Sequence, residues 1–225
     1  MITPQVQLFL LYVIPVLFAI VLHEVAHGYV AKLRGDHTAA LLGRLSLNPI
    51  KHIDPIGTIL VPAILIFTGA GFLFGWAKPV PIDWRNLKNP KKDMAWVALA
   101  GPAANLLMAI FWGIVAKIAV IIYPTFPEAG RIFLNMGYIG ISVNIILMIL
   151  NLIPIPPLDG SRIVTSFLPN HLAIKYNRLE RWGFFILIAL LIIPFNGSSL
   201  LFSIISPFMR FFMGIIGGVL NLPIL

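Results

Sequence analysis

The feature that most constrains this chain is a series of apolar runs, each long enough to cross a lipid bilayer. They cover about residues 8–31, 95–123, 132–153 and 200–222. A transmembrane helix needs about 20 consecutive, mainly apolar residues. Runs of this length predict an all-α polytopic membrane protein, with the lipid bilayer as its surroundings.

The composition supports this class and excludes others. Apolar residues make up 59% of the 225 positions and charged residues 11%, and the mean hydropathy is +0.96. Soluble domains average about 45–50% apolar and about 25% charged residues. A soluble globular protein and a disordered chain are therefore excluded, and the lack of cysteine excludes a disulfide scaffold. The net charge of +8 comes from basic residues clustered between apolar runs, so we expect no nucleic-acid partner.

The distribution of Lys and Arg predicts how the chain is oriented in the membrane. Segments 32–55, 77–94 and 154–182 together carry 13 of the 16 basic residues, whereas segment 124–131 carries one. Cytoplasmic loops are enriched in Lys and Arg. We therefore expect the N-terminus outside and the three basic segments in the cytoplasm. The apolar run 56–74 has a basic segment on either side, so we expect it to be re-entrant or interfacial, with a spanning helix as the alternative.

The C-terminal apolar region, about 183–222, is open to two interpretations. Pro194-Phe195-Asn196-Gly197 is typical of a turn, so the region forms either one bent span or two. In total the sequence predicts about four to six hydrophobic helices. The chain is interpreted as a single membrane-embedded domain, residues 1–225.

The first apolar run contains the chemistry. His23-Glu24-Val25-Ala26-His27 is an H-E-x-x-H motif, and on a helix its two histidines lie about 40° apart on one face. Two imidazoles can then bind one metal ion, with Glu24 as general base for a water. Ionisable groups inside a span cost about 2.5–3.5 kcal/mol each, and a divalent cation, with zinc preferred, compensates them. Solvation near the cytoplasmic end and histidine bonds between helices are the alternatives.

Asp159 is the best candidate for a third ligand. It follows three prolines in four positions, which cannot continue a helix, and we expect it in a turn with Gly160 at the depth of the histidines. The alternative is that Asp159 caps a helix starting at Ser161. Asp36 and Asp54 stay possible ligands. Three other acidic residues are interpreted as solvated loop charges: Asp83, Asp93 and Glu180.

Asparagines in the apolar runs need hydrogen-bond partners. For Asn105 and Asn144 we expect bonds between helices. Asn151 lies close to the proline break, where its amide can donate to a substrate carbonyl or an oxyanion.

Three motifs together resemble the site-2 protease family of intramembrane zinc metalloproteases. They are H-E-x-x-H, A-G-P-A-A-N of residues 100–105, and N-x-x-P-x-P-P-L-D-G of residues 151–160. The resemblance covers about residues 15–165 and is strongest to compact prokaryotic-type members, which lack a PDZ or nucleotide-binding regulatory domain. It implies a catalytic core of about residues 8–165 built on three helices.

The resemblance also implies roles and partners. His23, His27 and Asp159 match the ligands of one zinc ion per chain, Glu24 matches the catalytic acid/base, and Asn151 matches the asparagine that orients substrate. The implied activity is a metalloendopeptidase of a prokaryotic cell membrane, with its active site toward the cytoplasm. Transmembrane proteins are its substrates. Two rival hypotheses are a transporter or proton pathway that uses the buried His/Glu cluster, and a catalytically inactive zinc-binding scaffold.

Overall fold

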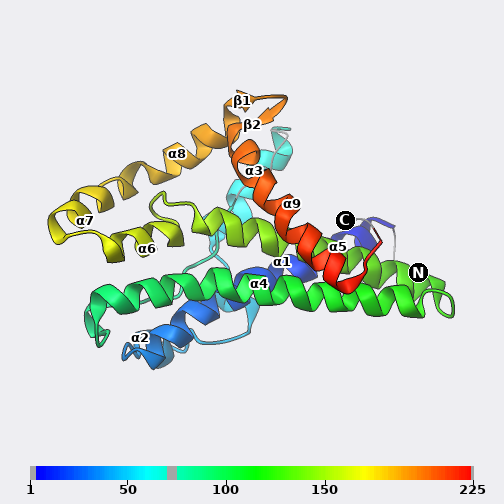
Figure 1. Ribbon diagram of the computed structural model, residues 1–225, viewed down its shortest axis with the longest axis horizontal. Coiled ribbons are helices and arrows are strands. Elements are labelled where there is room, and N and C mark those ends of the chain that lie inside the picture. The colour runs from blue at the N-terminus through cyan, green and yellow to red at the C-terminus, as the bar shows by residue number, and fades with distance from the viewer. Residues whose placement is uncertain (1–3, 70–74, 224–225) are drawn as a thin grey trace.

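The computed structural model describes residues 4–69 and 75–223, and this part of the chain is almost entirely helical (Figure 1). Four helices contain stretches that are long and apolar enough to cross a membrane, which confirms the predicted all-α polytopic membrane protein. They are α1 (Pro4–Leu33), α4 (Pro90–Ile122), α5 (Pro127–Leu152) and α9 (Leu200–Leu220).

Shorter elements connect these helices. Between α1 and α4 lie α2 (Thr38–Leu41), the 3₁₀ turn η1 (Pro49–His52), the π-helix η2 (Pro55–Leu60), α3 (Val61–Phe67) and the 3₁₀ turn η3 (Trp84–Asn86). After α5 come α6 (Asp159–Phe167), α7 (Asn170–Asn177) and α8 (Glu180–Ile192), followed by the antiparallel pair β1 (Pro194–Phe195) and β2 (Ser198–Ser199). The C-terminal apolar region is therefore two helices joined by a hairpin, and α8, at 13 residues, is shorter than a span.

Local signals set the helix boundaries. α4 and α5 each begin at a proline, which lacks the N–H that a first turn leaves unpaired. α4 starts five residues before the predicted span because the Asp93 carboxylate accepts the N–H of Asn89 at 2.8 Å and closes its first turn. Asp93 is buried and also lies 3.5 Å from the Arg34 guanidinium, so its interpretation as a solvated charge was wrong.

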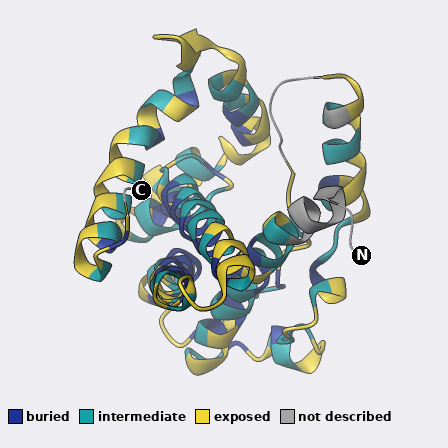
Figure 2. Cartoon of the chain, turned by 90° about the vertical axis from the view of Figure 1, so that its right-hand side faces the viewer, coloured by how far each residue is buried: buried dark blue, intermediate teal, exposed yellow. Residues whose placement is uncertain are grey.

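The main core lies between α4, α5 and α9. Ile141 and Ile145 of α5 are fully buried and pack with Trp112 of α4 and Ile205 of α9. Figure 2 shows buried residues concentrated on the central helices and exposed residues on the outer ones. Gly140 permits the close approach of α4, because a Cβ at this position would overlap the Trp112 ring.

The predicted re-entrant segment returns to its starting point. The Trp76 N–H donates to the Gly57 carbonyl at 3.1 Å, and the Thr58 hydroxyl donates to the Trp76 carbonyl at 2.8 Å. Residues 70–74 lie outside the described part of the chain. The two ends of the segment are side by side, which is the arrangement that a re-entrant path requires. Its depth in a bilayer stays a prediction.

Candidate metal centre

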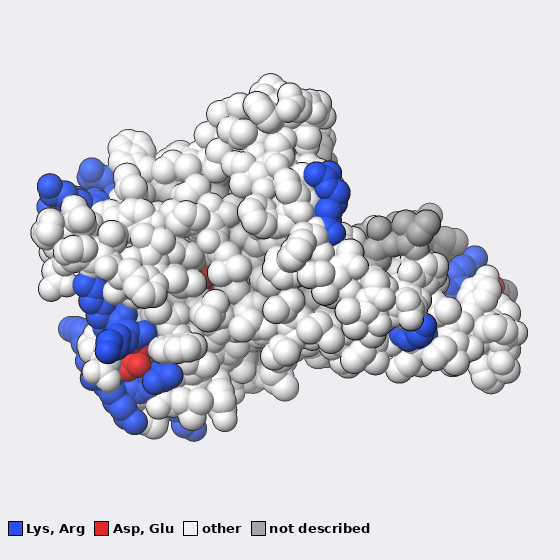
Figure 3. All heavy atoms as spheres, in the orientation of Figure 1, with Lys and Arg blue, Asp and Glu red and all other residues white. Residues whose placement is uncertain are grey.

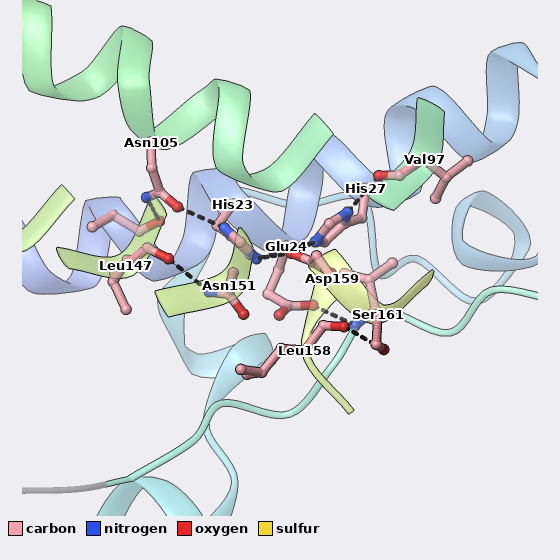
Figure 4. A network of polar contacts seen from close by, with 12 residues as sticks. His23, Glu24, His27, Val97, Asn105, Leu147, Asn151, Leu158, Asp159 and Ser161 are labelled. Carbon is pink, nitrogen blue, oxygen red and sulfur yellow. Dashed lines mark hydrogen bonds and ion pairs between the residues drawn. The ribbon is translucent and has the colours of Figure 1, made fainter. Parts of the chain in front are cut away.

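Two histidines of α1 and one aspartate of α6 point toward one another (Figure 4). His23 and His27 are buried, and their Nε2 atoms lie 3.0 Å apart. Asp159 Oδ2 lies 3.2 Å from each of these nitrogens. The three possible ligand atoms all lie within 4.8 Å of one another. The helical spacing of the H-E-x-x-H motif thus places both imidazoles on one face, as predicted.

Asp159 is the first residue of α6, and not part of a turn as predicted. The chain turns earlier, at the prolines after α5, and helical geometry resumes at Asp159 itself. The N-cap residue is Leu158, which makes no side-chain cap. The idea that Asp159 caps a helix starting at Ser161 was therefore wrong, and its carboxylate is directed at the two histidines instead.

The donor set fits a zinc ion. Oδ2 of Asp159 is buried and has no hydrogen-bond donor within residues 4–69 and 75–223. A buried carboxylate oxygen without a donor is costly, and a cation between it and the two imidazoles removes that cost. Two imidazole nitrogens and one carboxylate are a known zinc ligand set that leaves a fourth position open.

The opposite nitrogen of each histidine is fixed by α4. His27 Nδ1 lies 2.7 Å from the Val97 carbonyl, and His23 Nδ1 lies 2.6 Å from Asn105 Oδ1. A carbonyl oxygen only accepts, so His27 must donate from Nδ1. In both histidines the Nε2 lone pair is then directed at the site. A hydrogen bond from the other ring nitrogen fixes the tautomer and orientation of metal-binding histidines in this way.

The orientation of Asn105 is fixed by a chain of bonds that ends on the backbone. The Asn144 amide donates to the Gly140 carbonyl at 2.8 Å, so its Oδ1 must be the acceptor for Asn105 at 3.0 Å. Asn105 Nδ2 also donates to the Ala19 carbonyl at 3.1 Å. Its Oδ1 is therefore the atom that faces His23. The predicted helix-to-helix bond of Asn105 and Asn144 is present. Its extension to His23 was missed, because spacing within one helix does not tell which neighbouring helix faces it.

Glu24 lies beside the three possible ligands. Its Oε2 accepts the Val80 N–H at 2.8 Å, so a backbone amide from the segment after α3 reaches the carboxylate. The sequence contained no local signal for this contact, which joins residues 56 positions apart.

Asn151 is half-buried near the end of α5 and lines the same cavity as Glu24. Its Nδ2 donates to the Leu147 carbonyl at 3.0 Å, within its own helix. The structure therefore brings Asn151 to the site, but shows its amide bound to α5.

A cavity of about 1220 Å³ connects these groups. Its floor is polar and contains His23, Glu24, His27, Asn151 and Asp159. Its walls are mainly apolar and come from α5, α8, α9 and segment 75–84. A cavity of this kind, with a few convergent polar groups, is typical of a binding site.

The other two acidic candidates have structural roles. Asp36 is buried and accepts hydrogen bonds from the Asp83 N–H at 2.9 Å and the Asn86 amide at 3.2 Å. Asp54 caps η2 and accepts the N–H groups of Ile56 and Gly57.

Two of the acidic residues interpreted as solvated form ion pairs. Asp83 Oδ2 lies 2.7 Å from Arg85, and Glu180 Oε2 lies 3.0 Å from Arg162. Neither is part of the three-residue group.

Comparisons with known proteins match this geometry. The family model of peptidase family M50 matches residues 121–194. "Putative zinc metalloprotease YwhC" of Bacillus subtilis is 39% identical over 199 residues, which is 86% of this chain and 85% of that protein. "Putative zinc metalloprotease Rip2" of Mycolicibacterium smegmatis is 30% identical over 197 residues, 84% of this chain and 69% of that protein. No solved structure matches the chain.

Proposed function

The chain belongs to peptidase family M50, the site-2 proteases, and we propose that it hydrolyses peptide bonds within or near transmembrane segments of membrane-protein substrates. It is a compact zinc metalloprotease and an integral, multi-pass membrane protein. The observation that carries the proposal is that Asp159 of α6 meets His23 and His27, which lie inside a helix long and apolar enough to span a membrane.

One zinc ion per chain is assigned to His23, His27 and Asp159. Zinc held there supplies Lewis-acid chemistry, which makes a water nucleophilic near neutral pH and polarises a carbonyl. The bonds of His23 to Asn105 and of His27 to Val97 keep the two imidazoles oriented, with Nε2 directed at the site.

The remaining steps are assigned to two side chains that line the cavity. The Glu24 carboxylate takes a proton from the attacking water and then delivers it to the leaving amine. The Asn151 amide donates to the oxygen of the scissile carbonyl as negative charge develops there. Its present bond to Leu147 uses one of its two N–H groups.

The cavity supports a substrate segment that reaches the site at membrane depth. His27 lies six residues before the end of α1 at Leu33, which is about 9 Å along the helix axis. Most of the cavity wall is apolar, as a transmembrane segment requires. The peptide bond to be cut must leave its own helix before attack, because helical carbonyls are already hydrogen-bonded.

The charge distribution supports a site toward the cytoplasm, and the bacterial relatives support a prokaryotic cell membrane. Figure 3 shows most Lys and Arg gathered at the end of the molecule where α2, α6 and α7 lie. α1 ends at that same end of the molecule. By the positive-inside rule this end faces the cytoplasm.

The proposal is tested by metal content and by cleavage of a model substrate. Zinc is measured by mass spectrometry on detergent-purified wild type, His23→Ala and Asp159→Ala, with His171→Ala as a histidine control from α7. We expect about one zinc per chain, lost in the two site variants only. Zinc that is unaffected by Asp159→Ala would remove the proposed third ligand.

Glu24→Gln separates the protease from its rivals. The probe is a fluorescence-quenched single-span peptide, an alternating Leu-Ala helix interrupted by Asn-Pro, in lipid vesicles. We expect Glu24→Gln to retain zinc and to lose cleavage by about 10²–10⁴-fold. Mass spectrometry of the fragments locates the cut. Equal cleavage by the variant contradicts the role of Glu24, and a cut confined to the flanks outside the apolar stretch contradicts the intramembrane site.

A further inference from the structure

The segment of residues 75–83 crosses α1 at the Glu24 carboxylate. It has no helical or strand structure. Within it Val80 is buried, and its N–H donates to Glu24 Oε2 at 2.8 Å. The other carboxylate oxygen, Oε1, is not part of this bond. A backbone amide, unlike a side chain, has no rotamers to change, so its direction depends on what holds the segment.

The Val80 side chain fits a notch in the surface of α1. Gly28 lies four residues after Glu24 and therefore on the same helix face. A Cβ at Gly28 would lie 2.7 Å from Val80 Cγ1 and 2.5 Å from Leu45 Cδ2, closer than real Cβ contacts. The glycine thus leaves the space that Val80 occupies. The N–H and the side chain of Val80 engage one strip of α1, one helical turn apart.

The backbone just before Val80 is held from two sides. Arg44 Nη2 donates to the carbonyls of Lys78 at 3.0 Å and Pro79 at 3.2 Å. The Lys78 N–H donates to the His52 carbonyl at 2.9 Å. These are the two residues that precede Val80, so their carbonyl directions set the direction of its N–H. Arg44 is placed for this contact by the turn after α2, where Gly43 has a φ of +63°.

We propose that the Val80 N–H is an orienting donor for the catalytic carboxylate, and that Gly28 and Arg44 are the positioning residues that keep it in place. By binding Oε2, the amide leaves Oε1 as the atom that accepts a proton from the attacking water and returns it to the leaving amine. This inference rests on the proposed function of Glu24 as acid/base. It adds two residues, Gly28 and Arg44, that are not among the possible ligands and do not themselves line the cavity.

The first measurement is hydrogen exchange, which does not depend on activity. In the full chain in detergent, the peptide containing Val80 is followed in wild type, Arg44→Ala, Gly28→Ala and Glu24→Ala. We expect the Val80 amide to exchange at least about 10-fold faster in all three variants, because each removes the acceptor or displaces the donor. Arg85→Ala is the control, since its side chain is 89% exposed and pairs with Asp83 of the same connecting region.

The second measurement determines kcat and KM separately for cleavage of the same quenched peptide. For Arg44→Ala and Gly28→Ala we expect kcat to fall about 10-fold, the effect of one misplaced hydrogen bond to a charged group. KM and zinc content stay within about twofold of wild type. Arg44→Lys keeps one donor for a carbonyl and restores part of kcat. Gly214→Ala is the matched glycine control, because a Cβ there meets no atom within 4 Å.

Three outcomes would overturn the proposal. A rise in kcat in Arg44→Ala would make the contact an autoinhibitory one. A fall in zinc content or melting temperature parallel to kcat in both variants would make Arg44 and Gly28 purely structural. Unchanged Val80 exchange in Glu24→Ala would show that the bond does not form. If Glu24→Gln still cleaves while Val80 exchange behaves as expected, the proposed function fails and the contact itself stands.

Discussion

The two sides of the candidate metal centre are built in opposite ways. On the α4 side, His23 and His27 are bound through Asn105 and the Val97 carbonyl, and all the side chains involved are buried. On the cavity side, the walls from α8 and α9 are apolar, and α9 is the least buried of the four candidate spans. The polar bonds of the site are concentrated on the first side.

This difference matches the two tasks of such a site. A metal ligand must stay within a narrow geometry, so its supporting bonds are complete and run back to backbone carbonyls. A wall that receives an apolar segment needs space and few polar groups. Substitutions on the α4 side should therefore change zinc affinity and stability, and substitutions on the cavity side should change substrate affinity.

The largest expected effect comes from breaking the α4 side at Asn105. Asn105→Leu removes the acceptor for His23 and leaves the Asn144 Oδ1 without its donor. We expect zinc affinity to fall about 10–100-fold and unfolding free energy to fall by about 1–3 kcal/mol for each buried polar atom left unpaired. Chelator competition and thermal unfolding measure the two effects.

Asn105→Asp separates these two effects. It keeps an oxygen facing His23 but loses the Nδ2 donor to Ala19 and Asn144. Zinc affinity should recover toward wild type while the melting temperature stays low. If Asn105→Leu binds zinc as tightly as wild type, the α4 side does not support the ligands.

A second expected effect contrasts the packed core with the open face of α9. Gly140→Ala forces a methyl group into the Trp112 ring at the contact of α4 and α5, and overpacking of this kind costs about 1–3 kcal/mol. At about 2–4 °C per kcal/mol, the melting temperature should fall by several degrees. Gly214→Ala on α9 has open space, so it should not lower the melting temperature, and the higher helix propensity of alanine should raise it by about 1–4 °C. Equal shifts in the two variants would show that the two regions are not packed differently.

The sequence predicted what depends on spacing within one element. The H-E-x-x-H spacing places His23 and His27 on one face, and the prolines after α5 end that helix before Asp159. The class of fold and the positions of the apolar helices follow from composition and run length. These signals are local, so one chain is enough to find them.

What the sequence did not predict depends on contacts between distant elements. Asn105 was expected to bond between helices, but its contact with His23 needs the rotation of α4 relative to α1. Val80 reaches Glu24 from an irregular segment whose backbone is bound by Arg44, so the contact joins three separate parts of the chain. Asp93 was misread because its charged neighbours in sequence suggested solvent, whereas it is buried and pairs with Arg34, the residue after α1.

A third prediction tests the cavity side at Phe202. This side chain lies in the first turn of α9, is about half exposed and lines the cavity. Phe202→Ala should raise KM for the quenched peptide about 3–10-fold, because it removes apolar contact area from the substrate wall, and should leave zinc content unchanged. A loss of zinc in this variant would mean that the two sides are not independent.

The smallest expected effect concerns Asp36, whose hydrogen bonds join the end of α1 to segment 75–86 at the edge of the cavity side. Burial alone raises the pKa of the Asp36 carboxyl, but hydrogen bonds from Thr38, Asn86 and the Asp83 N–H outweigh it and hold the pKa below its ordinary value. A carboxyl with a lowered pKa in the folded state stabilises the fold above its ordinary pKa, and the contribution is lost as pH falls through the lowered value.

As the pH falls below about 4, the melting temperature of the wild type should therefore fall more steeply than that of Asp36→Asn. The difference between the two falls should be a few degrees at most. Thermal unfolding between pH 7 and pH 3 measures the difference. Glu128→Gln is the control, because its carboxylate is exposed in a pair with Arg131 and such pairs contribute about 0–1 kcal/mol. Parallel pH curves for wild type and Asp36→Asn would show that this edge of the cavity is not held by the Asp36 charge.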